Sequence, residues 1–455
     1  MSRRNKVRVG SGAGTSDDRM VPALELVERG ELDFLVFECL AERTVARESL
    51  ARSKDPEKGY TPSMPERLRM VLPACVKQEV RIVTNMGAAN PLGGAKAVRR
   101  EARELGLGDI ACAVVLGDEV TALVRGHPEL PLMETGEPLE SILPRLVSAN
   151  AYLGADVISK ALATDAPVVL TGRVADPSLF LASMMYALGW SYDDLPKLAM
   201  GTLAGHLLEC TAQLTGGCFG WPGKKDVPDL ANVGYPFADV TADGSVSLGK
   251  TPGSGGRLDV MTCTEQMLYE IHDPAAYFTP DCVLDITGVR LLQEAKDRVR
   301  VEGAKASPRT DTYKVTIGYS NGYIGEGEVS YGGIDAVARA QWAAEVVKER
   351  LRARGFTYED FRVDLIGMSS LHGDPGSRPE PYEVRLRMAG RSFDRRAAHA
   401  IGFEVRALHM HGPGGSGGGC EPRVRDVLAV KSVLLPKQLV NPQVVMEGSY
   451  ESARL

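Results

Sequence analysis

Short apolar runs alternate with helical patterns through the first half of the chain. Five runs rich in Val, Ile and Leu predict buried strands, at residues 7–10, 33–38, 80–85, 110–117 and 167–172. Between these runs, apolar residues recur at helical spacing, as in "GAKAVRREARELG". Buried strands that alternate with amphipathic helices are typical of a doubly wound, mostly parallel sheet. We therefore expect residues 1–225 to form an α/β domain.

The pattern changes at the Pro/Gly/Lys-rich stretch "GWPGKKDVPD", which marks the expected domain boundary. Strands and turns follow it, and then a long helix over 334–355, two more strands, a helix near 393–407 and a strand over 426–435. We expect residues 226–455 to form an α+β domain. This domain would either close a cleft on the first domain or form the interface of a homo-oligomer.

Composition and charge exclude several classes of protein. With 44% hydrophobic and 25% charged residues, the chain of 455 residues has ample material for a core. A net charge of -6 gives no reason to expect nucleic acid or an anionic membrane as a partner. No apolar run approaches the ~18 residues of a membrane span, and no signal core precedes the first strand. We expect a cytoplasmic protein, and the eight cysteines, which form no C-x-x-C pair, are expected to be reduced.

Polar residues follow each predicted strand of the α/β domain, at the edge where such sheets bind ligands. We expect four of them, Glu38, Asn85, Asp118 and Arg173, to open into one cavity. The other candidates near this edge are Ser11, Asn90, Thr171, Gly172 and Asp176.

The stretch "GSGAGTSDD", residues 10–18, raises the question of a nucleotide site. Its glycines read G-x-G-x-G, which is not the dinucleotide fingerprint, and the Gly-Lys-Ser/Thr of a phosphate loop is missing. Asp17 and Asp18 fall where the next helix is expected to begin, so carboxylates would take the place of a phosphate. We therefore expect no nicotinamide, flavin or ATP and no other cofactor. The loop is either a tight turn with a capped helix or a wall for a polar organic substrate.

A stripe of polar residues lies in "LAMGTLAGHLLECTAQLTGG", residues 198–217. On a helix, one face would carry Thr202, His206, Glu209, Cys210 and Gln213. Glu209 is the only acidic residue in this stretch, and a carboxylate beside a histidine in uncharged surroundings suggests burial, pairing and a shifted pKa. The stripe is either part of a site or an internal packing network. A metal site is the weaker interpretation, because no second cluster of ligands is evident.

A second unusual stretch, "HMHGPGGSGGG" at 409–419, is very rich in glycine. It predicts either a mobile lid or a loop clamped by a ligand. His409 and His411 alternate as on a strand, and a paired metal role does not fit that spacing.

Several long motifs carry a resemblance to a known family. They are "NAYLGA", "TGRVADPSL", "GHLLEC…QLTGG", "TPGSGG…TEQMLYEIHDPAAYFTPD" and "TYKVTIGY". With these motifs the chain resembles the acyclic terpene utilisation AtuA family from about residue 7 to 440. It departs at "TNMGAANP", where "TNAGGLNP" is closer to the family, and at "TGRVADP", where a threonine or serine is usual. The resemblance implies a setting of citronellol and geraniol degradation through acyl-CoA intermediates. Some relatives carry a small ferredoxin-like domain after the main body, or are encoded beside it. The resemblance therefore also implies a separate small ferredoxin-like subunit as a partner of this chain.

These features together favour a cofactor-independent lyase, of the hydratase/dehydratase or retro-aldol type. The substrate would be a branched hydroxy- or enoyl-carboxylate or its CoA thioester. Glu209 with His206 would supply the acid/base pair, and Asp118 or Glu38 the second acid or base. Arg173 suits a substrate carboxylate, and Asn85 with loop amides suits the oxyanion. The remaining candidates for substrate contact are Ser11, Asn90, Thr171, Gly172, Asp176, Thr202, Gln213, Gly216 and Gly217.

The alternative is a non-catalytic subunit that binds an acyl-CoA or a small partner protein within a catabolic complex. A buried Glu209–His206 pair would favour the enzyme. An exposed apolar edge in the C-terminal domain would favour the binding subunit.

Overall fold

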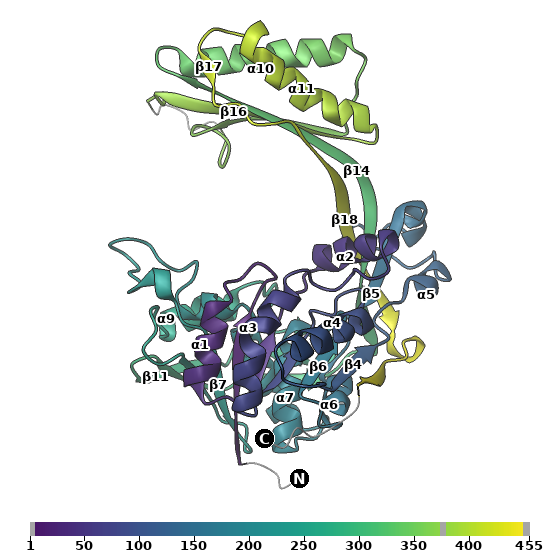
Figure 1. Ribbon diagram of the computed structural model, residues 1–455, viewed down its shortest axis with the longest axis vertical. Helices are drawn as coiled ribbons and strands as arrows, with labels where there is room; N and C mark the ends of the chain where they lie inside the picture. Colours follow the sequence, from purple (N-terminus) through teal and green to yellow (C-terminus); the bar gives the residue numbers. More distant parts are fainter. Residues whose placement is uncertain (1–4, 374–378, 449–455) are drawn as a thin grey trace. The chain divides into compact units, whose positions relative to one another are not determined.

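The computed structural model describes residues 5–373 and 379–448 and divides the chain into two compact units. Unit 1 extends to Gly318 and resumes at Val430, and unit 2 is Tyr319–Ala429. The chain leaves unit 1 within strand β14 (Thr312–Gly332) and returns within strand β18 (Arg423–Pro436) (Figure 1). Unit 2 is therefore inserted into the sequence of unit 1.

The boundary expected near residue 225 does not separate these units. Strand β7 (Pro236–Thr241) pairs antiparallel with β1 (Lys6–Ala13), so the residues beyond 225 continue the sheet of unit 1. The texture of the sequence changes there because antiparallel strands extend the parallel sheet, and not because a new domain begins.

Unit 1 is built on a mixed sheet of ten strands, whose parallel centre confirms the predicted α/β class. The strand order is β11-β12-β8-β7-β1-β2-β3-β6-β4-β19, and β1, β2, β3, β6 and β4 are parallel to one another. The four central strands after β1 are β2 (Phe34–Phe37), β3 (Arg81–Thr84), β6 (Val168–Thr171) and β4 (Cys112–Leu116). The antiparallel strands at the edges are β8 (Val246–Lys250), β12 (Arg298–Glu302), β11 (Arg290–Ala295) and β19 (Gln443–Glu447).

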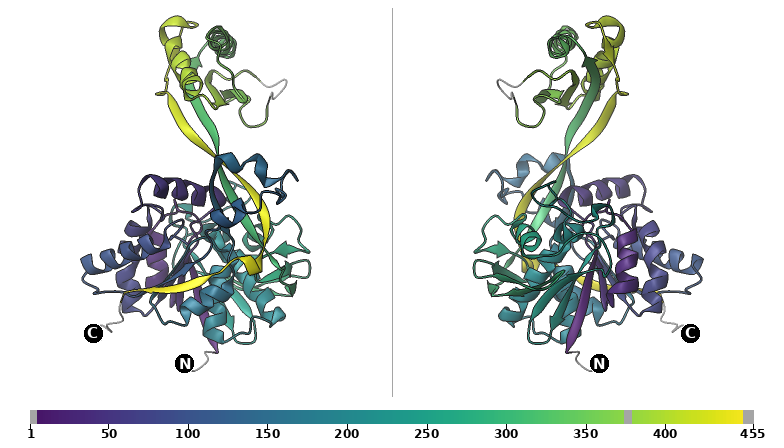
Figure 2. Two further views of the ribbon diagram at one scale, coloured as in Figure 1. Left: turned by 90° about the vertical axis from the view of Figure 1, so that its right-hand side faces the viewer. Right: turned by 90° about the vertical axis from the view of Figure 1, so that its left-hand side faces the viewer.

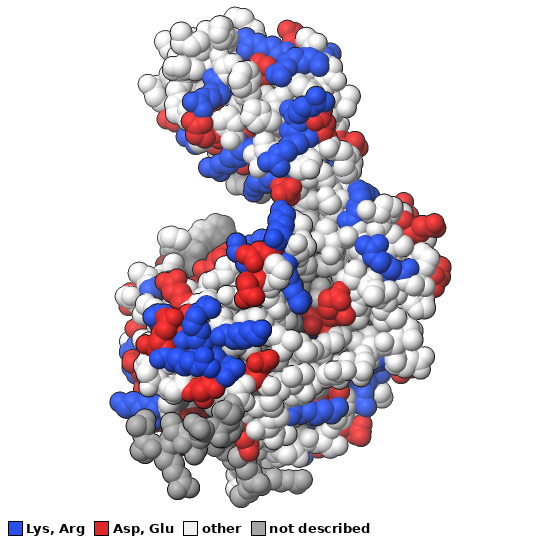
Figure 3. Space-filling view, turned by 45° about the vertical axis from the view of Figure 1, so that its right-hand side comes forward, with Lys and Arg blue, Asp and Glu red and all other residues white. Residues whose placement is uncertain are grey.

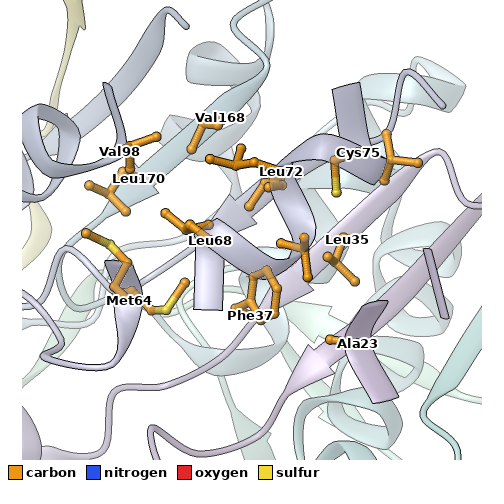
Figure 4. Close-up of a cluster of buried hydrophobic side chains, with 14 of the residues drawn as sticks. Ala23, Leu35, Phe37, Met64, Leu68, Leu72, Cys75, Val98, Val168 and Leu170 are labelled. Atoms are coloured by element: carbon orange, nitrogen blue, oxygen red, sulfur yellow. The ribbon is translucent and has the colours of Figure 1, made fainter. Parts of the chain in front are cut away.

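Helices cover both faces of this sheet, as a doubly wound fold requires (Figures 1 and 2). The helices of one face are α1 (Val21–Gly30), α3 (Met64–Lys77) and α4 (Pro91–Glu104). The helices of the other face are α6 (Ala155–Leu162), α7 (Asp176–Leu188) and α8 (Leu195–Glu209). Figure 4 shows the core of the first face, where Leu68 and Leu72 of α3 lie over Phe37 and Leu170 of the strands. Burial of this apolar surface is what fixes the strand ends in space.

Residues 146–151 form strand β5 (Leu146–Ala151), which pairs with β14. Two local predictions need correction. Residues Gly10–Ala13 belong to β1, so the glycine turn is shorter than expected. His409 and His411 end helix α11 (Arg395–His411), where both are exposed, and do not alternate along a strand.

Unit 2 packs two helices on one face of an antiparallel sheet, in agreement with the predicted α+β character. Its elements follow the order β14, α10 (Ala336–Ala353), β15 (Asp360–Ile366), β16 (Glu383–Ser392), α11 and β18. In space β16 lies between β15 and β14, and β18 also pairs with β14. This is the split βαβ order of ferredoxin-like folds. On the surface shown in Figure 3, basic and acidic side chains are mixed over each unit.

Close packing between β14 and α11 predicts a strong effect of one methyl group. A Cβ atom added at Gly325 would lie 1.7 Å from the carbonyl oxygen of Ala398, so the helix would have to move off the sheet. We expect Gly325→Ala to destabilise unit 2 by about 1–3 kcal/mol, the usual cost of overpacking. Gly332→Ala on the same strand is the matched control, because its nearest neighbour would be 4.0 Å away. Urea unfolding followed by circular dichroism measures both, and equal midpoints would contradict the packing described.

Candidate active site

Four predicted site residues meet at the carboxyl edge of the parallel strands. Glu38 follows the last residue of β2, Asn85 follows β3, Asp118 follows β4, and Arg173 follows β6. All four side chains are buried. Because parallel strands place their carboxyl ends at the same edge, residues far apart in the sequence lie together there.

Glu38 and Asn85 form one hydrogen-bonded pair. The Asn85 amide donates to Glu38 Oε1 over 2.8 Å, and its carbonyl oxygen accepts the Cys39 backbone N–H, also over 2.8 Å. Burial raises the pKa of Glu38, and nearby Arg173 opposes that shift. With both ends of its amide engaged, Asn85 orients Glu38, which differs from the role of an oxyanion donor predicted for it.

Asp118 holds the backbone on which Arg173 sits. Its Oδ2 accepts the Arg173 backbone N–H over 2.8 Å and the Asn150 amide over 2.9 Å. Burial raises the pKa of Asp118 to about 6, against the effect of these two donors. Gly172 permits this contact, because a Cβ atom there would lie 2.5 Å from the Asp118 carboxylate oxygens. The segment 441–442 packs against the preceding Gly117, which has a φ of 103°.

Arg173 is the central cation of the site, and its side chain is 1% exposed. Its Nη2 forms an ion pair with Asp176 at the start of α7, and its guanidinium stacks 4.2 Å above the ring of Tyr152. Nε and Nη1 are buried and have no hydrogen-bond partner among the described residues. Buried N–H groups are normally paired, so two unpartnered ones mark Arg173 as a candidate donor to a ligand oxygen.

A second charged pair lies beside the Arg173–Asp176 pair. Tyr152 donates its phenolic hydrogen to Glu42 of α2 (Glu42–Lys54), and Lys314 Nζ is 3.3 Å from the same carboxylate oxygen. Burial alone would raise the pKa of Glu42, but Arg173, Tyr152 and Lys314 outweigh it and lower the pKa to about 2. Glu42 is therefore ionised, while Glu38 is biased towards its protonated form.

His206 and Glu209 pair at the end of α8, as the sequence predicted. His206 Nδ1 is 2.8 Å from Glu209 Oε1, and Nε2 is 3.2 Å from the Met267 carbonyl oxygen, which can only accept. Nε2 therefore carries a hydrogen, and one further proton is shared between Nδ1 and Oε1. Glu209 raises the pKa of His206 against the opposite effect of burial. Oε2 of Glu209 is buried without a partner in the described part of the chain.

The Glu209–His206 pair belongs to the same charged cluster as Arg173. Burial raises the pKa of Glu209, and Arg173 is among the charges that oppose this shift. Glu209 in turn contributes to raising the pKa of Glu38. The acid/base pair from α8 and the strand-edge residues therefore form one electrostatic unit.

Tyr277 was not among the predicted site residues. It lies on β9 (Tyr277–Phe278), and its ring centre is 5.5 Å from that of His206. Burial and then the charges of Glu209 and Asp176 raise the pKa of its phenol, which keeps it protonated. Tyr152, Lys314 and Tyr277 follow no periodic pattern in the sequence, although all three fall within the motifs "NAYLGA", "TYKVTIGY" and "DPAAYFTPD".

Several other candidates have internal partners. The helix ends at Glu209, so Gln213 lies in the following 3-10 turn and not on the stripe, while Thr202 Oγ1 is 3.5 Å from Cys282 Sγ. Gly216 and Gly217 close that turn, and Gly217 donates to the Ala212 carbonyl oxygen. These residues end and pack α8, and among the described contacts none of them forms a hydrogen bond with the Glu209 carboxylate.

Ser11, Thr171 and Asn90 are also engaged within the protein. The Ser11 hydroxyl is 2.7 Å from that of Thr211, directly after the Glu209 helix, and Thr171 Oγ1 donates to the Gly172 carbonyl. The Asn90 side chain caps α4, since it accepts the Gly93 N–H, and it also donates to the carbonyls of Pro56 and Lys58 in the segment before α3. Asn90 is therefore a helix cap.

The glycine turn is also closed by a side chain. Asp18 Oδ2 accepts the backbone N–H groups of Gly14 and Thr15, so a carboxylate occupies the position where a phosphate would bind. The following helix begins only at Val21 and has no side-chain cap, which corrects the expectation that Asp17 and Asp18 cap it. A Cβ atom at Gly14 would lie 2.6 Å from the Glu209 carbonyl oxygen, so this turn packs directly against the end of α8.

The site has a buried end and an end that solvent reaches. His206, Glu209 and Arg173 are nearly inaccessible, whereas the side chains of Asp176 and Glu42 are 35% and 39% exposed. In the residues that the structure describes, no three His, Cys, Asp or Glu side chains are arranged to hold a metal ion. The same residues include no helix with the length and apolar character needed to cross a bilayer.

Comparison with known proteins identifies the family. The chain belongs to the acyclic terpene utilisation AtuA family, whose model matches residues 7–446 and so nearly the whole chain. No curated protein and no solved structure matches it significantly.

The environment of Asp118 predicts how stability depends on pH. Its pKa of about 6 lies above the ordinary 3.8, so its contribution to stability is complete below about pH 4 and is lost as the pH rises through 6. We expect Asp118→Asn to remove this loss and to raise the free energy of unfolding at pH 7.5 by up to about 3 kcal/mol, with little change near pH 4. Urea unfolding at both pH values measures the difference.

The exposed Asp243 provides a control of opposite sign. Hydrogen bonds from Thr241 and Ser245 lower its pKa, so Asp243→Asn should reduce stability at pH 7.5. An Asp118→Asn variant that is destabilised equally at both pH values would contradict the raised pKa of the Asp118 carboxyl group.

Proposed function

We propose that this member of the AtuA family is a cofactor-independent lyase, a hydratase/dehydratase or a retro-aldol enzyme, that acts on a branched hydroxy- or enoyl-acyl substrate. One observation carries the proposal. Glu209, paired with His206, keeps a free carboxylate oxygen and interacts electrostatically with Arg173, whose Nε and Nη1 are also buried without a partner among the described residues. A base beside donors for a developing negative oxygen is what proton removal next to a carbonyl requires.

The first step would be the removal of that α-proton by Glu209. The C–H bond breaks, the proton joins Glu209 Oε2, and the electron pair forms the carbon–carbon double bond of an enolate. Negative charge then develops on the carbonyl oxygen, where Nε and Nη1 of Arg173 stabilise it. His206 supports the step because the proton that it shares with Glu209 holds the carboxylate in place while Oε2 stays free.

The second step would be the departure of the β-hydroxyl group. Glu38 is suited to protonate it, because burial raises the pKa of Glu38 above its ordinary value. Asp118 is less suited, since its Oδ2 is occupied by Arg173 and Asn150. The C–O bond breaks, its electron pair leaves with the oxygen, and water is the product. Two carboxyl groups in different environments thus divide the roles of base and acid.

The retro-aldol variant uses the same groups. A base would remove the proton of the β-hydroxyl, the carbon–carbon bond would break, and Arg173 would again stabilise an enolate oxygen. The geometry supports both variants, since both need the same base and the same oxyanion donors.

A second candidate function, non-catalytic binding of an acyl group or of a partner protein, is favoured by one feature of unit 2. A cavity of about 580 Å³ lies there, lined in part by Phe403 and Met410, which are both exposed apolar side chains. Exposed apolar surface of this kind is typical of interaction sites. The two functions differ in one respect that can be measured: the lyase removes a proton from its substrate, whereas a binding subunit does not.

The proposed base predicts the behaviour of one variant. Glu209→Gln preserves volume and hydrogen bonding but cannot exchange a proton, so we expect near-native stability and a loss of at least roughly a hundredfold in turnover. Glu101→Gln is the matched control, because Glu101 is also buried and forms an ion pair, in this case with Arg69. Both residues lie on the helices that cover the opposite face of the sheet from α8. We expect this control to keep wild-type turnover.

Activity can be found by offering branched hydroxyacyl and enoyl thioesters in deuterated water. Mass spectrometry then detects α-deuterium exchange, gain or loss of water, or cleavage. Full exchange and turnover in Glu209→Gln would exclude Glu209 as the base. The absence of exchange, hydration and cleavage across the panel would favour the binding function.

A further inference from the structure

We infer, building on the proposed function, that the group bound at Arg173 is an uncharged carbonyl of an ester, thioester, amide or ketone, and not a carboxylate. The inference follows from the number of charges already present around the free N–H groups of Arg173. It makes the substrate class narrower, and it replaces the role of carboxylate receptor that the sequence suggested for this residue.

Three cationic side chains of the described residues pair with carboxyl groups of this site, and each uses an anionic partner. Arg173 is paired with Asp176 and Lys314 with Glu42, and His206 shares its proton with Glu209.

The site also contains carboxyl groups that have no cation of their own. Glu38 is held by the Asn85 amide and the Leu40 backbone N–H, and Asp118 by Asn150 and the Arg173 backbone N–H. Both lie among the groups that surround Arg173. Five carboxyl groups therefore accompany the three cationic side chains before any ligand binds. The carboxyl groups are those of Glu38, Glu42, Asp118, Asp176 and Glu209.

A carboxylate ligand would add another negative charge, and none of these three cations is left unpaired to receive it. In a buried site an uncompensated charge is costly, so such a ligand could bind only if the site took up a proton. The neutral phenols of Tyr152 and Tyr277 face the same cluster and add no positive charge.

An uncharged carbonyl avoids this cost. It accepts hydrogen bonds from Nε and Nη1 of Arg173 without changing the charge of the site. When its α-proton moves to Glu209, one negative charge leaves the carboxylate and one appears on the enolate oxygen. The total charge of the buried cluster is the same before and after the step, so the protein need not reorganise to accommodate a new ion.

Calorimetry can test this charge balance directly. We would offer a series of branched enoic acids, beginning with 3-methylbut-2-enoate, each as the free acid and as its uncharged N-acetylcysteamine thioester. Titrations at pH 7 in two buffers of different ionisation enthalpy give the number of protons taken up on binding. We expect no net uptake for the thioesters. For the free acids we expect weaker binding and an uptake of about one proton. Their affinity should therefore fall about tenfold for each unit by which the pH rises.

Two variants locate the effect. Arg173→Lys keeps the charge but loses the two N–H groups, so it should weaken thioester binding at least tenfold. Arg300→Lys, on an edge strand of the sheet, should change nothing. The contact between Arg173 and the thioester carbonyl should also shift the infrared stretching band of that carbonyl in the bound thioester. We expect this shift in the wild type and its loss in Arg173→Lys, and the readout holds even if the variant protein is slightly less stable.

Two results would overturn the inference. One is tighter binding of the free acids than of the thioesters without proton uptake, and the other is the absence of thioester binding throughout the series. Deuterium exchange separates this outcome from a failure of the proposed function. Thioesters that bind at Arg173 without proton uptake and without exchange would support the inference and exclude the lyase.

Discussion

The buried guanidinium of Arg173 is the interaction on which the site depends. A cation in a region of low dielectric interacts strongly with every carboxyl group near it. Here Arg173 opposes the rise in pKa that burial causes at Glu38 and Glu209, and it lowers the pKa of Glu42. Without it, the carboxyl groups of the strand edge would be buried without a counter-ion. Its position is fixed by its own backbone N–H, which Asp118 accepts, and by the stacking of its side chain on Tyr152.

This arrangement places groups of different proton affinity within one small volume. The pKa of Glu42 is lowered to about 2, that of Asp118 is raised to about 6 and that of Glu38 is raised by burial, although all three are carboxylic acids. The differences come from burial and from the distance to the few cations present. Such separation of proton affinities is common at sites of proton transfer, and it costs stability that the large apolar core of unit 1 offsets.

Much of the fold could be predicted from the sequence because the signals are local. Apolar runs located all five central strands, and the parallel order placed Glu38, Asn85, Asp118 and Arg173 at one edge. The Glu209–His206 pair was predictable because no other acidic residue competes for the histidine in that stretch. The domain boundary was not predictable, since strands beyond residue 225 look alike whether they extend the first sheet or begin another. The roles of Asn85 and Asn90 were also beyond a single sequence, because an amide that orients a carboxylate or caps a helix has the same composition as one that binds substrate.

The last described strand has a consequence for how the protein is made. Strand β19 completes the sheet beside β4, and the residues before it pack against Gly117, next to Asp118. During synthesis the edge of β4 therefore stays open until residues 443–447, which follow the inserted unit 2, have left the ribosome. An open strand edge is prone to pair with other chains, so this interval is the period of greatest risk of aggregation. A chain truncated before residue 443 would retain all the charged residues of the site and still lack the strand that pairs with β4 beside Asp118.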